Sequence, residues 1–200
     1  KVVDVAPRLK AALSSSVEAA AEAIFTTDTR LKVTSRLITI GSTNVHLSAF
    51  AKGSGMVAPQ LATVLVFITT DAAISPSALQ AVLDRAVRGS FNNLIIDGDM
   101  SPNDSVFALA NGLAGNVALD EDVEGFAEFE AALTDTCVEL ARAIAEDGEG
   151  ATKAIEVQIE GAPDEDIGRD LARSVAGSSM VKAAVFGADP IDSGEIYVKG

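Results

Sequence analysis

Thr63 is the residue in this sequence whose type and position could support covalent catalysis. Residues 52–60 include two glycines and a proline, which favour an irregular loop because they combine a permissive backbone with a fixed one. Residues 64–68 are apolar and rich in β-branched side chains, a pattern typical of a buried strand. If the bond between Ala62 and Thr63 were cut, Thr63 would hold a hydroxyl nucleophile together with an α-amino base of pKa about 7.7–8.0.

A threonine at the head of a strand usually has only a structural role, so the spacing alone does not establish this cut. Residues 52–72, however, resemble the self-cleavage segment of the bifunctional ornithine acetyltransferase (glutamate N-acetyltransferase) family. In that family the precursor cuts itself between alanine and threonine, and the new N-terminal threonine carries the acetyl group. The resemblance implies that Ala62 and Thr63 flank the cleavage site and that Thr63 is both the catalytic and a substrate-binding residue.

Two further segments resemble the same family and imply substrate-binding residues. Residues 24–29, together with Lys32, are similar to its threonine-rich signature, in which Thr26 would contact the substrate. Lys52 would bind the substrate's α-carboxylate, a role that suits a compact cation in a partly buried pocket. Residues 147–153 resemble the segment whose glutamate pairs with the substrate amine, and Glu149 stands at that position. Without the resemblance, the same residues are interpreted as a helix end, a solvated loop lysine and a helix C-terminal cap.

Residues 97–104 form an acidic loop that begins like a calcium-binding loop. Pro102 stands where that loop needs glycine and Ala108 where it needs glutamate, so we expect no calcium and assign no metal site. The loop also resembles the family, which has threonines at the places of Met100 and Pro102. This favours a supporting role for the loop. The alternative is an acidic cap, with Asp104 in the first turn of a following helix.

The composition narrows the classes of function. The 200 residues suffice for one domain with a buried core, and 48% hydrophobic and 22% charged residues are typical of a soluble α/β protein. A net charge of −14 argues against nucleic acids and anionic membranes as partners, and no apolar run approaches a membrane span. Cys137, the single cysteine, fits a reducing, cytoplasmic setting, and its apolar helical pattern predicts a buried side chain. The sequence does not start with methionine, and we expect it to be part of a longer protein.

Hydrophobic periodicity predicts a mixture of helices and strands. A hairpin is expected over residues 32–49, with a turn after Ile40 and with His46 on the solvent face, opposite Val45 and Leu47. Helices are expected at 7–24, 76–89, 106–113, 126–144 and 164–176, and short strands at 64–68, 93–96 and 155–159. The pattern alone indicates an α/β or α+β fold. The family resemblance implies an αββα sandwich like that of the N-terminal-nucleophile hydrolases.

The resemblance covers residues 10–190 and implies one domain, 1–200, from an incomplete family member. Residues 1–62 would end an alpha chain and residues 63–200 would begin a beta chain, the two assembling as a heterotetramer. The implied reaction is acetyl transfer from N-acetylornithine to glutamate in arginine biosynthesis, without a cofactor but with acetyl-coenzyme A as an alternative donor. The family's tryptophan motif after Pro190 and its Thr-Gly oxyanion pair are missing. Two alternatives therefore stay open: an amidohydrolase or aminopeptidase that uses Thr63, and a catalytically inactive fragment or subunit.

Overall fold

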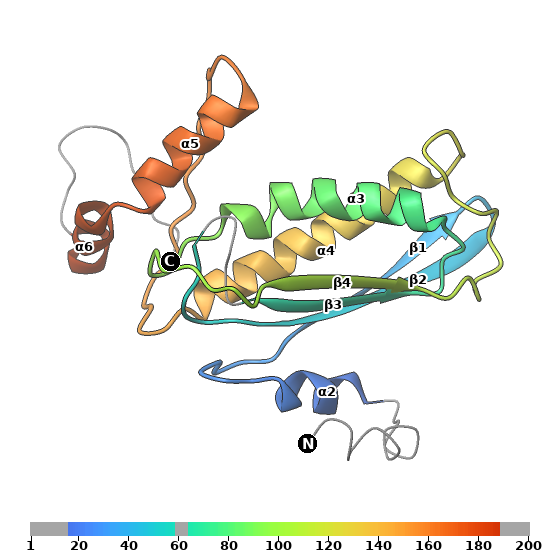
Figure 1. Ribbon diagram of the computed structural model, residues 1–200, viewed down its shortest axis with the longest axis horizontal. Helices are drawn as coiled ribbons and strands as arrows, with labels where there is room; N and C mark the ends of the chain where they lie inside the picture. Colours follow the sequence, from blue (N-terminus) through green and yellow to red (C-terminus); the bar gives the residue numbers. More distant parts are fainter. Residues whose placement is uncertain (1–15, 59–63, 189–200) are drawn as a thin grey trace.

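A four-stranded sheet with two long helices against one face forms the centre of the protein (Figure 1). The computed structural model describes residues 16–58 and 64–188. In chain order the elements are α2 (Val17–Ala23), β1 (Lys32–Ile40), β2 (Thr43–Lys52), β3 (Leu65–Thr70), α3 (Pro76–Gly89), the 3₁₀ turn η3 (Phe91–Asn93), β4 (Ser105–Ala110), α4 (Phe126–Glu146), α5 (Glu165–Ala176) and α6 (Ser179–Gly187).

The strands lie in the order β1-β2-β3-β4. The first three are antiparallel neighbours, whereas β4 runs parallel to β3, which the crossover through α3 allows. The predicted hairpin is confirmed: Ile40 pairs with Thr43 across a two-residue turn, in which Gly41 adopts a φ of +60°. His46 is exposed on the outer face of β2, as expected.

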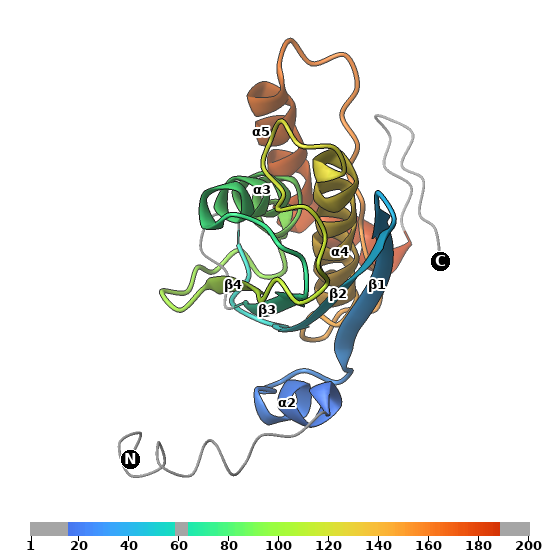
Figure 2. The same cartoon turned by 90° about the vertical axis from the view of Figure 1, so that its right-hand side faces the viewer.

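One face of the sheet packs against α3 and α4 (Figure 2). Alternate residues of β2, such as Val45 and Leu47, are fully buried there, and α4 contributes a stripe that includes Phe129 and Leu133. Burying a side chain of this size is worth about 1.5–3 kcal/mol relative to leaving it exposed. Cys137 lies in the same stripe and is fully buried, which confirms the prediction for this residue. The two helices thereby fix the positions of the strand ends that carry the candidate site.

The other face of the sheet carries a ladder of aromatic side chains. The rings of Phe50 and Phe67 stack with centroids 5.1 Å apart, and those of Phe67 and Phe107 with centroids 5.3 Å apart. Helix α2 lies on this side of the sheet, opposite α3 and α4 (Figures 1 and 2). The α/β class is confirmed. The described residues supply one sheet and one helical layer of the expected αββα sandwich.

Several helix boundaries agree with the sequence because their caps are local. The side chain of Ser75 accepts a hydrogen bond from the Ala78 N–H at 3.1 Å, and Pro76 occupies the first turn of α3. The side chain of Asp164 accepts from the Ile167 N–H at 2.8 Å and caps α5 in the same way. Helix α4 follows the predicted apolar stripe and ends at Glu146.

Four predicted elements differ from the structure. The helix expected at 7–24 begins only at Val17, because Ser16 is extended and caps it; residues 7–15 lie outside the described part of the chain. The segment 106–113, expected to be helical, is strand β4 and its following turn, since its backbone pairs with β3. The strand expected at 93–96 is the end of the η3 turn and an irregular segment. Residues 155–159 alternate in polarity, but no strand of the described sheet lies beside them and they form none.

Candidate active site

Lys52 and Thr26 meet where β2 ends. Lys52 is the last residue of β2 and is 5% exposed, and its Nζ lies 3.3 Å from the Thr26 Oγ1 in the loop after α2. No carboxylate within the described residues forms an ion pair with this ammonium group. A buried cation with a neutral hydroxyl as its partner is suited to bind an anion.

Hydrogen bonds join the loop after α2 to the loop after β2. The Gly53 N–H donates to the Asp28 Oδ1 at 2.7 Å, and the hydroxyls of Thr27 and Ser54 share a hydrogen bond of 2.5 Å. The loop that carries Thr26 and the loop that follows Lys52 are therefore held as one unit, on the edge where the sheet meets the end of α4.

Glu149, on the loop after α4, is hydrogen-bonded to the same pair of loops. It lies three residues beyond the end of α4, and its N–H donates to the Ser54 carbonyl at 2.7 Å. Its exposed carboxylate packs against Gly55: a Cβ at Gly55 would lie 2.8 Å from the Glu149 Cδ. Only glycine leaves room for the carboxylate in this position. A hollow of about 490 Å³ opens beside Thr27 and Glu149.

A buried cluster of charges lies beneath these loops. The Lys32 Nζ donates to the Asp28 Oδ1 at 2.7 Å and to the Asp147 Oδ2 at 2.5 Å, and the three side chains are 0–3% exposed. Asp147 also accepts hydrogen bonds from the Thr29 N–H, at 3.0 Å, and from the Thr29 hydroxyl. Burial alone would raise the pKa of Asp147, but these hydrogen bonds and the charge of Lys32 outweigh it and lower the pKa to about 2. Asp147 is therefore ionised and holds the loop of Glu149 against the loop of Thr26.

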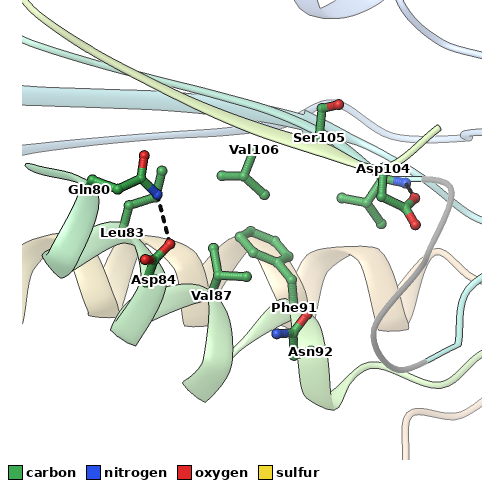
Figure 3. Close-up of a pocket in the computed structure, with 10 residues that line it drawn as sticks. Gln80, Leu83, Asp84, Val87, Phe91, Asn92, Asp104, Ser105 and Val106 are labelled. Atoms are coloured by element: carbon green, nitrogen blue, oxygen red, sulfur yellow. Dashed lines mark hydrogen bonds between the residues drawn. The ribbon is translucent and has the colours of Figure 1, made fainter. Parts of the chain in front are cut away.

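Ala62 and Thr63 lie outside the described residues, which resume at Val64. Val64 is buried, and its N–H donates to the Asp104 Oδ1 at 2.9 Å while its carbonyl accepts from the Ser105 N–H at 3.0 Å. Figure 3 shows Asp104 and Ser105 at the start of β4, beside a cavity of about 250 Å³ that is also lined by Phe91. The strand that follows Thr63 is thus fixed by the start of β4.

The family profile of the ArgJ family matches residues 1–197. The chain belongs to the ArgJ family. It is 50% identical over 185 residues to the arginine biosynthesis bifunctional protein ArgJ of a Synechococcus strain, which covers 92% of this chain and 45% of the relative. The ArgJ protein of Thermotoga neapolitana is 47% identical over 169 residues, covering 84% of this chain and 43% of that protein. The chain thus spans less than half the length of these relatives.

A solved ArgJ structure confirms both the family and the fold. The arginine biosynthesis bifunctional protein ArgJ of Bacillus halodurans superimposes with a TM-score of 0.60 at 44% identity, over 62% of this chain and 58% of that one. The ArgJ family is the one that the sequence motifs predicted. No helix in residues 16–58 or 64–188 is long and apolar enough to cross a membrane.

In this ArgJ-family chain the structure brings three of the predicted site residues, Thr26, Lys52 and Glu149, to one cluster of loops. Their roles in binding stay predictions. Sequence reasoning assigned no role to Lys32 and overlooked Asp147, although both fall within the quoted family segments. A lysine and an aspartate that become fully buried carry no periodic signal that could reveal their pairing.

The acidic loop also differs from its sequence interpretation. Asp104 does not cap a helix, because the element that follows it is β4. Both carboxylate oxygens of Asp97 accept backbone N–H groups, from Met56 and Val57. Near the other end of β2, the exposed His46 pairs with Asp71 through its Nδ1 at 2.9 Å.

Proposed function

We propose that this chain carries the reaction centre of an ornithine acetyltransferase that works through an acetyl-Thr63 intermediate. The observation that carries the proposal is the pairing of buried Lys52 with Thr26, on the loop that leads to Thr63. The ammonium group has a hydroxyl as its hydrogen-bond partner within the described residues, and the Glu149 N–H donates to Ser54 on the loop that follows Lys52. Membership of the ArgJ family, whose relatives are named for bifunctional arginine biosynthesis, supports the same reaction.

Self-cleavage comes first in this mechanism and consumes one water molecule. The Thr63 hydroxyl attacks the carbonyl carbon of Ala62, the peptide C–N bond breaks, and the proton of the hydroxyl passes to the departing Thr63 nitrogen. Water then hydrolyses the ester, which leaves a carboxylate on Ala62 and restores the Thr63 hydroxyl. The product is a threonine whose hydroxyl and α-amine act as nucleophile and base.

Acetyl transfer then follows in two halves. The Thr63 hydroxyl attacks the acetyl carbonyl of N-acetylornithine, the α-amine relays the proton to the leaving nitrogen, and ornithine departs. The amine of glutamate attacks the acetyl ester and regenerates the hydroxyl, giving N-acetylglutamate. Lys52 binds the α-carboxylate, Thr26 hydrogen-bonds to the substrate, and Glu149 pairs with the amine. The chemistry needs no cofactor, and acetyl-coenzyme A could enter as an alternative acetyl donor.

The same proposal covers the assembly. Cleavage would leave residues 1–62 on an alpha chain and residues 63–200 on a beta chain, and a heterotetramer of the two would act in the cytoplasm. Because the chain spans 45% of its Synechococcus relative, the oxyanion donors and other substrate contacts would come from the remaining parts of the protein. The stacked phenylalanines on the open face of the sheet are suited to pack against such a further layer.

The test is intact mass and N-terminal sequencing of the full-length protein. A fragment that begins at Thr63 is expected in the wild type and in a Thr69→Ala control, an exposed threonine of β3. Thr63→Ala should leave the chain uncut. A single uncut chain in every variant contradicts the proposal.

Acetyl-donor assays then separate the reaction from its closest alternative. The cut wild type should produce N-acetylglutamate only when glutamate is present, and Lys52→Met should raise the KM for N-acetylornithine. Release of acetate at the same rate without glutamate would instead identify an amidohydrolase that uses the same nucleophile.

A further inference from the structure

The acidic loop between η3 and β4 contacts the segment that contains the cleavage site on its upstream side. The Asp97 Oδ2 accepts a hydrogen bond from the Met56 N–H at 2.5 Å, and the Asp97 Oδ1 accepts from the Val57 N–H at 3.0 Å. The Val57 carbonyl in turn accepts from the Ile96 N–H at 2.9 Å. Val57 is fully buried, so this end of the segment is fixed in both backbone and side chain.

The same loop contacts the segment on its downstream side. The Asp104 Oδ1 accepts from the Val64 N–H at 2.9 Å, and the Ser105 N–H donates to the Val64 carbonyl at 3.0 Å. This pair of hydrogen bonds begins the parallel ladder of β3 and β4, whose next rung joins Leu65 to Ser105. Val64 is bonded directly to Thr63, so Asp104 holds the described residue that follows the nucleophile in sequence.

Met56 shows that the upstream contact imposes a conformation. It has a φ of +52°, in the left-handed region that a side chain other than glycine or asparagine adopts at a cost of about 1–2 kcal/mol. Its N–H donates to Asp97, so the carboxylate stabilises a turn that the chain would otherwise avoid. Partial burial raises the pKa of Asp97, but the hydrogen bonds from the N–H groups of Asp99, Met56 and Val57 outweigh it and lower the pKa below its usual value. Asp97 is therefore charged, which strengthens its hydrogen bonds.

We propose that Asp97 and Asp104 form a two-point clamp that positions the Ala62–Thr63 bond for self-cleavage, and that Asp104 continues to position Thr63 in the cut protein. The proposal rests on the self-cleavage proposed above. One acidic loop reaches both sides of the scissile bond, and the two aspartates act as positioning residues through the backbone N–H groups they accept.

The second oxygen of Asp104 explains why its role would outlast the cut. The Asp104 Oδ2 is buried and has no hydrogen-bond partner within the described residues, an arrangement that is costly for a polar atom. Cleavage creates an α-ammonium group on Thr63, the residue next to Val64. The positively charged α-ammonium of Thr63 would be a suitable hydrogen-bond donor to the Asp104 Oδ2. Asp97, by contrast, binds residues that end up on the other chain.

The test compares three aspartates of the same loop in the full-length protein. Asp97→Asn and Asp104→Asn each remove charge and acceptor capacity from the clamp. Asp99→Asn is the matched control, since the exposed Asp99 side chain forms no hydrogen bond to the described residues. We expect the first two changes to slow the appearance of the Thr63 N-terminus by about ten-fold or more, on the scale of a lost charged hydrogen bond, and Asp99→Asn to match the wild type.

The rates are measured by intact mass on freshly purified precursor, at a temperature where circular dichroism shows each variant to be folded. Cleavage of all three variants at the wild-type rate overturns the clamp while leaving the proposed function intact. An uncut wild type overturns both. If Asp104→Asn does not fold, Asp97→Asn still tests the upstream contact of the clamp, because Asp97 is an exposed loop residue. Cleavage of Asp97→Asn at the wild-type rate would then overturn the proposal.

A purely structural role makes a different prediction for the cut enzyme. Asp97 accepts three backbone N–H groups and Asp104 accepts one, so loss of structure alone would make Asp97→Asn the more damaging change. The clamp predicts the reverse. Per cut chain, Asp104→Asn should lower kcat for acetyl transfer by about ten-fold at an unchanged KM, and by more than Asp97→Asn does. Equal losses, or a larger loss for Asp97→Asn, would contradict the continuing role of Asp104.

Discussion

The ammonium group of Lys32, at the start of β1, lies 2.5 Å from the carboxylate of Asp147, at the end of α4. Both side chains are almost completely buried, and Asp28 completes the cluster at 2.7 Å from the same nitrogen. The cluster joins the loop of Thr26 to the loop of Glu149, so the spacing of the proposed substrate-binding residues depends on it. Its energetics can therefore be tested separately from catalysis.

Lys32→Met should destabilise the protein by about 3–5 kcal/mol, because it leaves two buried carboxylates without their counter-charge. Urea unfolding followed by circular dichroism measures the change in the free energy of unfolding. Arg142→Met is the matched control: Arg142 pairs with Glu156 at 3.0 Å, but both side chains are exposed and the pair should be worth less than about 1 kcal/mol. Equal effects of the two changes would contradict the assigned role of the cluster.

The same cluster predicts how stability depends on acid. The pKa of Asp147 is about 2 in the folded protein against an ordinary value of 3.8, so the unfolded chain binds its proton more readily. Stability from this group is present in full above about pH 5 and is lost as the pH falls through about 2, a total of about 2 kcal/mol. Urea midpoints measured across this range should fall more steeply for the wild type than for Asp147→Asn. Parallel curves would show that Asp147 is not the group responsible.

Cys137 should be unreactive in the folded protein. It is fully buried in α4, and burial raises the pKa of its thiol to about 12, with the Ser90 hydroxyl acting weakly in the opposite direction. The reactive thiolate is therefore nearly absent at neutral pH. A chromogenic disulfide reagent should modify Cys137 only as fast as the protein unfolds, and fully in concentrated guanidinium chloride. Rapid modification with an unchanged circular dichroism spectrum would contradict this expectation.

The elements that sequence reasoning predicted well are those with local signals. Helices α3 and α5 have Ser75 and Asp164 as side-chain caps, and α4 has a long apolar stripe. Strand β4 was mistaken for a helix because six residues of apolar sequence fit either period. What decides its structure is the backbone of β3, about 40 residues earlier in the sequence, with which β4 pairs in parallel from Ser105 onward.

In the candidate site, too, the residues with a local sequence signal were predicted and the long-range contacts were not. Thr26, Lys52 and Glu149 were found because they lie in short segments that resemble a family, and the structure brings them together. The supporting contacts could not be found by pattern, since Lys32 and Asp147 are separated by 115 residues in sequence. A single charged residue has no periodicity, and only its burial beside an opposite charge gives it a role.

Gly55→Ala should weaken substrate binding without weakening the fold. The new Cβ would lie 2.8 Å from the Glu149 Cδ, so the carboxylate must move away from the position in which it would meet the substrate amine. Because Glu149 is exposed, it can move without disturbing the core. We expect the KM for N-acetylornithine to rise by about ten-fold, on the scale of one charged hydrogen bond, with the melting temperature nearly unchanged.

Gly89→Ala provides the control for this prediction. Gly89 is the last residue of α3, and a Cβ there would meet no atom within 4 Å, so the change should be neutral or slightly stabilising and leave the KM unaltered. Glu149→Gln should raise the KM by at least as much as Gly55→Ala, because it removes the charge instead of displacing it. Combining the two should add little, since both act on one contact. Full additivity would mean that Gly55 acts on the substrate by a route that does not pass through Glu149.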